Sequence, residues 1–294
     1  MSQPTGVAGP GAASSPTLVR AIGRWSLTAL AINAIIGSGI FGLPDDIARR
    51  VGAAAPLAYL LAALGMGVVM SCFAEVASQF GRAGGPYLYA RVAFGRFAGI
   101  EMGWFAWLVR ITSAAANANL FVVYLGQFLP GAAEPAVRAA LLALLVGVLG
   151  VVNVAGVRSG TRVSDVFAIA KLVPIAIFVA AGFVYVGRDI HPGPSGAPSA
   201  EWLQAILALV FAYGGFEAAL MPMGEARDPR RDAPFALFAA LGIVALVYML
   251  VHLVVMGAFP DPSAFSRPAV MDRPVAEAAR VFLGTAGASL IAIG

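Results

Sequence analysis

Long apolar stretches recur along this chain, and they restrict the folds open to it more than any other feature. A helix needs about 20 apolar residues to cross a bilayer, and the first apolar stretch, which lies between Arg24 and Asp45 and carries no charge, has 20. Six more apolar stretches follow it. The sequence therefore predicts seven transmembrane helices, at about residues 25–44, 52–78, 98–129, 138–157, 165–187, 202–225 and 233–259.

The charge content supports a membrane protein. Only 12% of the 294 residues are charged and 60% are apolar, whereas about 25% of residues are charged in soluble domains. We therefore expect an all-α polytopic protein whose surroundings are the lipid bilayer. The formal net charge of +4 does not indicate nucleic-acid binding, because basic residues of membrane proteins collect in loops and set orientation.

The two ends of the chain differ from its middle. Residues 1–21 are rich in Gly, Ala, Ser and Pro, a composition typical of disorder, so we expect a disordered tail there and a transmembrane domain over 22–294. An eighth apolar stretch begins near Val281 and reaches Gly294 after about 14 residues, which is too short to cross a bilayer. The prediction is thus seven complete helices and the start of an eighth, with the fold incomplete.

Loop charges favour a cytoplasmic N-terminus. With that orientation, ten loop arginines lie on the cytoplasmic side and seven on the other. Positive residues concentrate in cytoplasmic loops, so this small excess supports a multi-pass protein of the cell membrane (plasma or inner membrane) with its tail inside.

Two predicted helices carry residues that weaken a helix at mid-depth. The first contains Gly37-Ser38-Gly39, and the sixth contains Gly214-Gly215 followed by Glu217. Each interruption alone is also explained by close helix packing through small residues. The two lie five helices apart, however, so two successive five-helix units would insert with opposite topology. Matching broken helices in two such halves indicate the binding site of a transporter.

Charged residues inside the spans are the next candidates, because such residues are costly in lipid and commonly functional. Lys171, the only lysine of the chain, either serves a site or extends its ammonium group to the headgroups. Arg110 either lines a pathway or pairs with Glu217 or Glu101. Both alternatives remain open from the sequence.

Residues for catalysis or metal binding are scarce. His191 and His252 are far apart, and Cys72 is the only cysteine, so no metal site or cofactor is expected. Enzymatic chemistry needs a nucleophile and a base within hydrogen-bond reach, and the sequence offers no such pair. We therefore expect that the protein is not an enzyme.

Four motifs occur in an order and spacing that resemble the amino acid–polyamine–organocation permeases: "NAIIGSGIFGLP", "AEVASQFGRAGGPYLYARVAFG", "NVAGVRSGTRVSDVFAIAKLVP" and "FAYGGFEAALMPMGEARDPRRDAPFAL". The resemblance implies a LeuT-like fold of two inverted five-helix repeats, with helices 1 and 6 interrupted. The first repeat would cover about 22–188 and a partial second repeat about 200–294. Such proteins are secondary transporters of amino acids, polyamines and related amines.

The resemblance also implies roles for particular residues. Backbone amides at Gly37-Ser38-Gly39 would hold a substrate carboxylate, and carbonyls near Ile35 and Phe211-Ala212 would receive its ammonium group. Phe211 and Tyr213 resemble aromatic gates, and Glu217 matches an acidic position used in coupling or gating. The complete expected substrate-binding set is Ile35, Gly37, Ser38, Gly39, Ile40, Phe211, Ala212, Tyr213, Gly214 and Gly215.

Lys171, together with Glu217 and Arg110, forms the expected coupling or gating set. Lys171 resembles a helix 5 lysine of proton-coupled or sodium-independent members, and its ammonium group would stand where sodium-coupled relatives bind an ion. The resemblance therefore implies sodium-independent transport, with protons as the coupling ion or with substrate exchange. The alternative is a membrane protein of the same fold that binds or senses amino acids without transporting them.

Overall fold

The computed structural model describes residues 22–80, 82–154, 157–186 and 198–294, with the side chains of 157–165 left out. The expected disordered tail, residues 1–21, lies outside this range. Within the described residues the only β-structure is one isolated bridge between Ile22 and Ala226. The expectation of an all-α protein is confirmed.

Seven helical stretches in the described residues are long and apolar enough to cross a membrane. The number agrees with the prediction, but the membership differs: the interrupted first span is absent from the seven and the eighth is present. The stretches are Pro44–Ser78, Arg96–Leu125, Pro135–Val154, Val166–Val186, Ser199–Leu220, Pro229–Ala258 and Pro274–Ile293.

The first predicted span is broken into α1 (Arg24–Ile35), α2 (Gly39–Gly42) and α3 (Pro44–Val51). The expected end at residue 44 is wrong, because the helix resumes through the charged segment. There Asp45 pairs with Arg49 at 2.5 Å and Asp46 pairs with Arg50 at 2.8 Å. Ion pairs four residues apart neutralise one another along a helix, so these charges do not stop it.

The middle of the chain follows the predicted spans closely. After a turn at Gly52 with φ 54° come η1 (Gly52–Ala54) and α4 (Ala55–Ser78). A short helix that the apolar pattern missed, α5 (Gly85–Phe94), precedes α6 (Arg96–Leu125). Two further long helices are α7 (Pro135–Val154) and α8 (Val157–Val186), the latter beginning eight residues earlier than expected at residue 165.

The second interruption separates α9 (Ser199–Ala212) from two 3₁₀ turns, η2 (Phe216–Leu220) and η3 (Met223–Glu225). The remaining elements are α10 (Pro229–Ala258), η4 (Pro262–Ser266), α11 (Pro268–Asp272) and α12 (Pro274–Ile293). The sequence thus located both breaks correctly.

The predicted start of the eighth helix at Val281 is wrong. The helix α12 begins at Pro274 and spans 20 residues, with a kink at Gly284 where φ is 65°. Glu277 and Arg280 interrupt the apolar pattern, but their side chains pair at 3.0 Å within the first turns. The pairing lets the helix include both charges.

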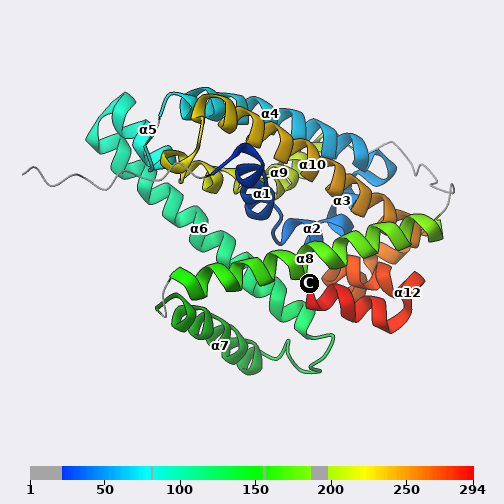
Figure 1. The fold of residues 1–294 in the computed structure, drawn as a ribbon. Coiled ribbons are helices and arrows are strands. Elements are labelled where there is room, and N and C mark those ends of the chain that lie inside the picture. The colour runs from blue at the N-terminus through cyan, green and yellow to red at the C-terminus, as the bar shows by residue number, and fades with distance from the viewer. Residues whose placement is uncertain (1–21, 81, 155–156, 187–197) are drawn as a thin grey trace, which may run out of the picture.

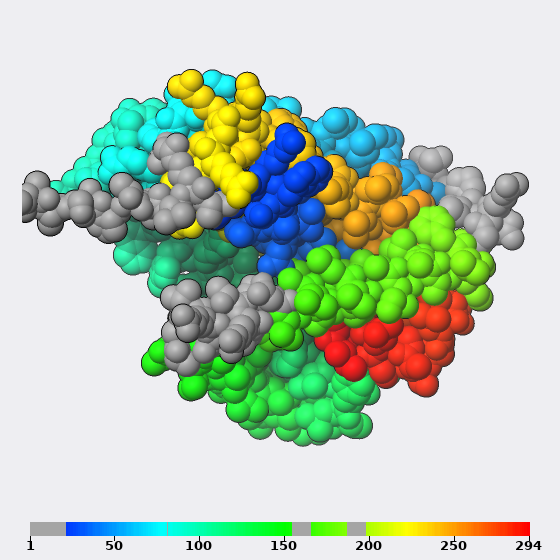
Figure 2. Space-filling view, in the orientation of Figure 1, coloured from blue at the N-terminus to red at the C-terminus, as the bar shows by residue number. Residues whose placement is uncertain are grey.

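Helix α1 packs mainly on α10 and on η2, and Figure 1 shows α8 crossing below it. Helix α10 packs on α4 and α1, and α4 also packs on α9. On another side, α12 packs on α8, and Figure 2 shows their surfaces in contact. Alanines such as Ala58, Ala62 and Ala240 are completely buried in these contacts. Small residues let transmembrane helices approach closely, where dispersion forces stabilise them.

Apolar side chains cover the periphery. Helix α7 has no buried residue, and on α6 Trp104 and Phe105 are 60% and 63% exposed. Exposed apolar side chains on this scale suit a surface that faces lipid rather than water. Composition, helix length and this surface together identify a multi-pass membrane protein.

Candidate functional site

The end of α1 leaves backbone carbonyl groups without the partners that a continuous helix would supply. The Ile36 amide donates to the Ile32 oxygen at 2.9 Å, and the chain then leaves the helix. Side chains of Lys171 and Tyr248, from two other helices, bind several of the remaining carbonyls. The break is therefore held open by specific hydrogen bonds.

Lys171 reaches from α8 to this break. Its Nζ atom donates to the Asn33 oxygen at 2.6 Å and to the Ile36 oxygen at 2.7 Å. A cation at the carboxyl end of a helix is electrostatically favourable. Of the two alternatives left open by the sequence, the structure therefore shows Lys171 bound to the break and not extended to the headgroups.

Tyr248 of α10, which the sequence analysis did not select, serves both breaks. Its hydroxyl group lies 3.2 Å from the Ile35 oxygen and 3.0 Å from the Ala212 oxygen. These are carbonyls that were expected to receive a substrate ammonium group. The Tyr248 hydroxyl now stands between them, and the side chain is almost completely buried.

The second break follows Ala212. Gly215 has a φ of 100°, a conformation that favours glycine. Its amide donates to Glu217 Oε2 at 3.1 Å. The chain turns there and continues as 3₁₀ turns, so α9 ends beside the break in α1.

The two breaks touch because both lack side chains at the contact. A Cβ atom on Gly39 would lie 2.8 Å from the Ala212 Cβ, and one on Gly215 would lie 2.5 Å from the Ala34 oxygen. Both values are below the separations that real Cβ atoms adopt. By contrast, a Cβ on Gly37 would have its nearest neighbour at 3.5 Å. Gly39 and Gly215 thus allow the interrupted helices to approach each other.

A cavity of about 570 Å³ opens where the breaks meet. Its walls come from three places: the α1–α2 break, the α9–η2 break and one face of α6. The lining residues are Ala34, Ile35, Gly37, Ser38, Gly39, Val109, Arg110, Thr112, Ser113, Ala114, Asn117, Phe211, Ala212, Gly214, Gly215 and Glu217. A volume of this size is typical of sites for small molecules.

Backbone amides at the first break offer hydrogen-bond donors. The Ser38 amide donates to Asn117 Oδ1 of α6 at 2.9 Å. The next two amides, of Gly39 and Ile40, donate to no other described residue. An amide without a protein partner must be satisfied by water or a ligand.

An ion pair closes one side of the cavity. Arg110 Nη2 lies 3.3 Å from Glu217 Oε1, and the Arg110 side chain is 47% exposed. The sequence left open whether Arg110 lines a pathway or pairs with Glu217 or Glu101. The structure shows that it lines the cavity and pairs with Glu217.

Most of the expected site residues come together, with three exceptions. Ile40 is buried and does not line the cavity. Tyr213 is completely buried, donates its hydroxyl to the Tyr59 oxygen at 3.3 Å and stacks on Tyr248. Lys171 contacts the break from outside the cavity. Phe211, in contrast, is 52% exposed and lines both this cavity and a neighbouring one of about 310 Å³.

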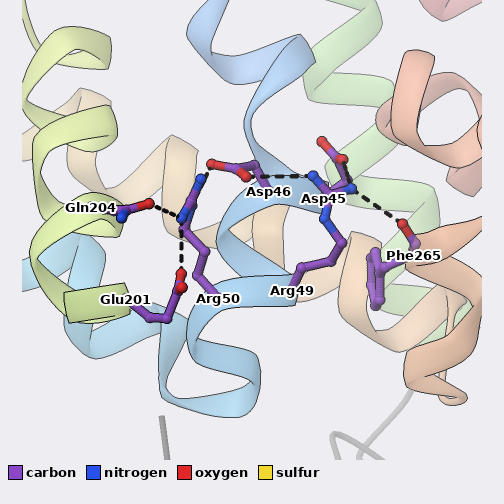
Figure 3. A network of polar contacts seen from close by, with 7 residues as sticks. All are labelled: Asp45, Asp46, Arg49, Arg50, Glu201, Gln204 and Phe265. Atoms are coloured by element: carbon purple, nitrogen blue, oxygen red, sulfur yellow. Dashed lines mark hydrogen bonds and ion pairs between the residues drawn. The ribbon is translucent and has the colours of Figure 1, made fainter. Parts of the chain in front are cut away.

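A polar network extends along α3, from Asp45 and Asp46 in its first turn to Arg49 and Arg50 in its last (Figure 3). Arg50 donates to Asp46 and to Glu201 of α9, each at 2.8 Å, and also to Gln204. Arg49 donates to the Phe265 oxygen of η4 at 3.2 Å. The network joins the second part of the broken helix 1 to the first part of the broken helix 6.

Comparisons with known proteins give one family match and several relatives. A family model described as amino acid permease matches residues 22–294. The methylthioribose transporter of Bacillus subtilis (strain 168) is 26% identical over 276 residues, which cover 86% of this chain and 59% of that protein. The Asc-type amino acid transporter 1 of Homo sapiens is 30% identical over 276 residues, which cover 89% of this chain and 53% of that protein.

A third relative, the b(0,+)-type amino acid transporter 1 of Mus musculus, is 28% identical over 248 residues, covering 81% of this chain and 51% of that protein. The chain thus spans little more than half the length of the curated relatives that it matches.

Proposed function

We propose that this chain, which belongs to the amino acid permease family, acts in secondary transport of amino acids or related amines across the cell membrane. The membership confirms the resemblance inferred from the four motifs. It also agrees with the expectation that the protein is not an enzyme, since the named relatives are transporters. The relatives' names favour a small-molecule substrate.

The observation that carries the proposal is the meeting of two broken helices at one cavity. The substrate carboxylate binds the free amide of Gly39, which lines the cavity at the first break. The ammonium group binds the carbonyls of Ile35 and Ala212, where it shares or replaces the Tyr248 hydroxyl. Charge-assisted hydrogen bonds are stronger than neutral ones, so the ammonium group competes well with that hydroxyl.

Phe211 acts as a gate. Its exposed side chain lines the substrate cavity and the neighbouring cavity, which the broken helix 1 and α6 also line. Movement of this ring would connect or separate the two spaces. Tyr213 acts from behind the site, because its buried ring supports Tyr248.

Lys171 replaces a coupling ion. Its ammonium group binds two carbonyls at the end of α1, as a sodium ion would. Loss of a proton from Lys171 would release these carbonyls and loosen the break. Transport is therefore sodium-independent and uses either protons or exchange, with Arg110 and Glu217 as gating residues beside the cavity.

The same proposal assigns topology. The N-terminus is cytoplasmic in the plasma or inner membrane, residues 22–294 form the permease domain, and residues 1–21 form its tail. The domain consists of a first five-helix repeat over about 22–188 and a partial, inverted second repeat over about 200–294, each opening with a broken helix.

Uptake by the purified protein in proteoliposomes tests the coupling. We expect uptake of an amino acid that is unchanged when sodium is replaced by choline and that responds to a pH gradient or to substrate inside the vesicle. The Lys171→Met variant should lose uptake while it still inserts and elutes as a single species. Strict sodium dependence without any response to pH would refute the role of Lys171. Binding without time-dependent uptake would instead favour the sensing alternative.

A further inference from the structure

The α6 wall of the cavity is polar along a single stripe. Arg110, Ser113 and Asn117 are spaced by three and four residues and all line the cavity. Residues with this spacing share one face of a helix. Together with Thr112, which also lines the cavity, the stripe gives the cavity a polar side opposite the two breaks.

Arg110 is the member of this stripe with the most unused hydrogen-bonding capacity. A guanidinium group has five N–H donors in a planar fork. Among the described residues, Arg110 makes one hydrogen bond, from Nη2 to Glu217 Oε1 at 3.3 Å. With nearly half of its side chain exposed, the remaining donors are accessible from the cavity.

Glu217 does not offer a comparable acceptor. One of its oxygens accepts from the Gly215 amide and the other from Arg110. Its side chain is only 21% exposed, against 47% for Arg110. Of the two charged side chains that line the cavity, the more exposed one is therefore the positively charged Arg110.

The donors fall into two groups at opposite ends of the stripe. Asn117 holds the Ser38 amide beside the proposed carboxylate site, and Arg110 stands seven residues earlier on the same helix. At a rise of 1.5 Å per residue this is about 10 Å between the backbones, and the long Arg110 side chain shortens the gap. An amino acid bound at the breaks would place the end of a side chain of moderate length near Arg110.

We infer that Arg110 determines substrate specificity, an inference that rests on the proposed function. It selects amino acids whose side chains end in an oxygen acceptor, a carboxylate or a carboxamide. It also rejects cationic amino acids and polyamines, because like charges repel in a site of low dielectric constant. The guanidinium fork matches such acceptors in geometry, with two parallel hydrogen bonds.

A competition experiment with four amino acids tests this inference. Each of four unlabelled amino acids (glutamine, glutamate, leucine and lysine) competes with radiolabelled leucine for uptake into proteoliposomes. The proteoliposomes contain the wild-type protein, Arg110→Met, Arg110→Lys or Arg110→Met/Glu217→Gln. In the wild-type protein we expect glutamine or glutamate to inhibit at least tenfold better than leucine, and lysine to inhibit least. The double variant removes the unpaired carboxylate that Arg110→Met leaves, and so separates specificity from misfolding.

In Arg110→Met and in the double variant, the preference for glutamine or glutamate over leucine should fall at least tenfold. Leucine affinity should be nearly unchanged. Arg110→Lys should keep the rejection of lysine and lose most of the preference, since it keeps the charge without the fork. An unchanged preference in the double variant, or a wild-type preference for lysine, would overturn the inference and leave the transport proposal intact. Absence of inhibition by all four amino acids would overturn the transport proposal as well.

Discussion

The contact between Gly39 and Ala212 allows a sharp test of how the two breaks are held together. In the Gly39→Ala variant the new Cβ would lie 2.8 Å from the Ala212 Cβ and 3.1 Å from its Cα, whereas carbon atoms attract best at about 3.5–4.0 Å. Overpacking of this kind costs about 1–3 kcal/mol. We expect a loss of that size in the free energy of unfolding and weaker substrate binding, because the breaks must separate.

Replacing Ala212 by glycine should relieve most of the overlap. Alone, Ala212→Gly costs about 1 kcal/mol through helix propensity. Combined with Gly39→Ala, it removes the methyl group that clashes, so the double variant should be less destabilised than the sum of the single variants. We expect a coupling energy of about 1–2 kcal/mol between the two positions.

Unfolding in mixed detergent micelles provides the free energies, and binding of a labelled amino acid provides the functional readout. Gly37→Ala is the matched control, because a Cβ there meets nothing closer than 3.5 Å, and it should change stability by less than about 1 kcal/mol. Additive effects at Gly39 and Ala212, within about 0.5 kcal/mol, would refute the claim that these residues set the approach of the helices.

Three further predictions follow from the structure, two of them with a control substitution. Gly215→Ala should lose about 2–5 kcal/mol of stability, because φ is 100° and the Cβ would lie 2.5 Å from a carbonyl oxygen of α1. Its control is Gly242→Ala, which should be neutral or stabilising because a Cβ there meets nothing within 4 Å. Equal losses of stability in the two variants would contradict this. Arg50→Met should lower the stability by about 1 kcal/mol and weaken substrate binding. Arg231→Met should change neither stability nor binding, because the Arg231 side chain is 89% exposed. Thermal unfolding of the two variants measures the difference in stability. His252→Leu should raise stability by about 1 kcal/mol, because both ring nitrogens are buried without a partner among the described residues, and a loss in the same assay would contradict this.

The sequence located the breaks because their signal is local. Gly37-Ser38-Gly39 and Gly214-Gly215 are helix-weakening residues inside apolar spans, and lipid tolerates loosened backbone only where protein or a cavity satisfies it. The interpretation of one glycine changes, however. The resemblance implied that Gly39 offers its backbone amide to a carboxylate, and the structure shows that its missing side chain leaves room for the Ala212 methyl group.

Helix ends were predicted less well for a definite reason. Charged residues stop an apolar pattern, but they do not stop a helix when they pair within it. Arg49 and Arg50 pair with Asp45 and Asp46 in α3, just as Glu277 pairs with Arg280 in α12. A hydropathy pattern does not register such pairs, although their spacing of three or four residues is visible in the sequence.

The facing of side chains required the tertiary structure. Tyr248 lies in an apolar span without a local signal that its hydroxyl group serves two breaks. Asn117 stands one helical turn from other small polar residues, and only the position of α6 shows that it reaches the Ser38 amide. Tyr213 adjoins the second break in sequence but does not line the cavity. The sequence does not decide this, because the residue before a turn can point to either side.

The central claim is that backbone groups at the two breaks bind the carboxylate and the ammonium group of one amino acid. Binding of three ligands to the purified protein tests it directly: glutamine, its α-methyl ester, which lacks the carboxylate charge, and its N-acetyl derivative, which lacks the ammonium charge. The account predicts that both analogues bind at least tenfold more weakly than glutamine, because loss of a charge-assisted hydrogen bond costs about 1.5–3 kcal/mol. Equal affinity for all three ligands would contradict it.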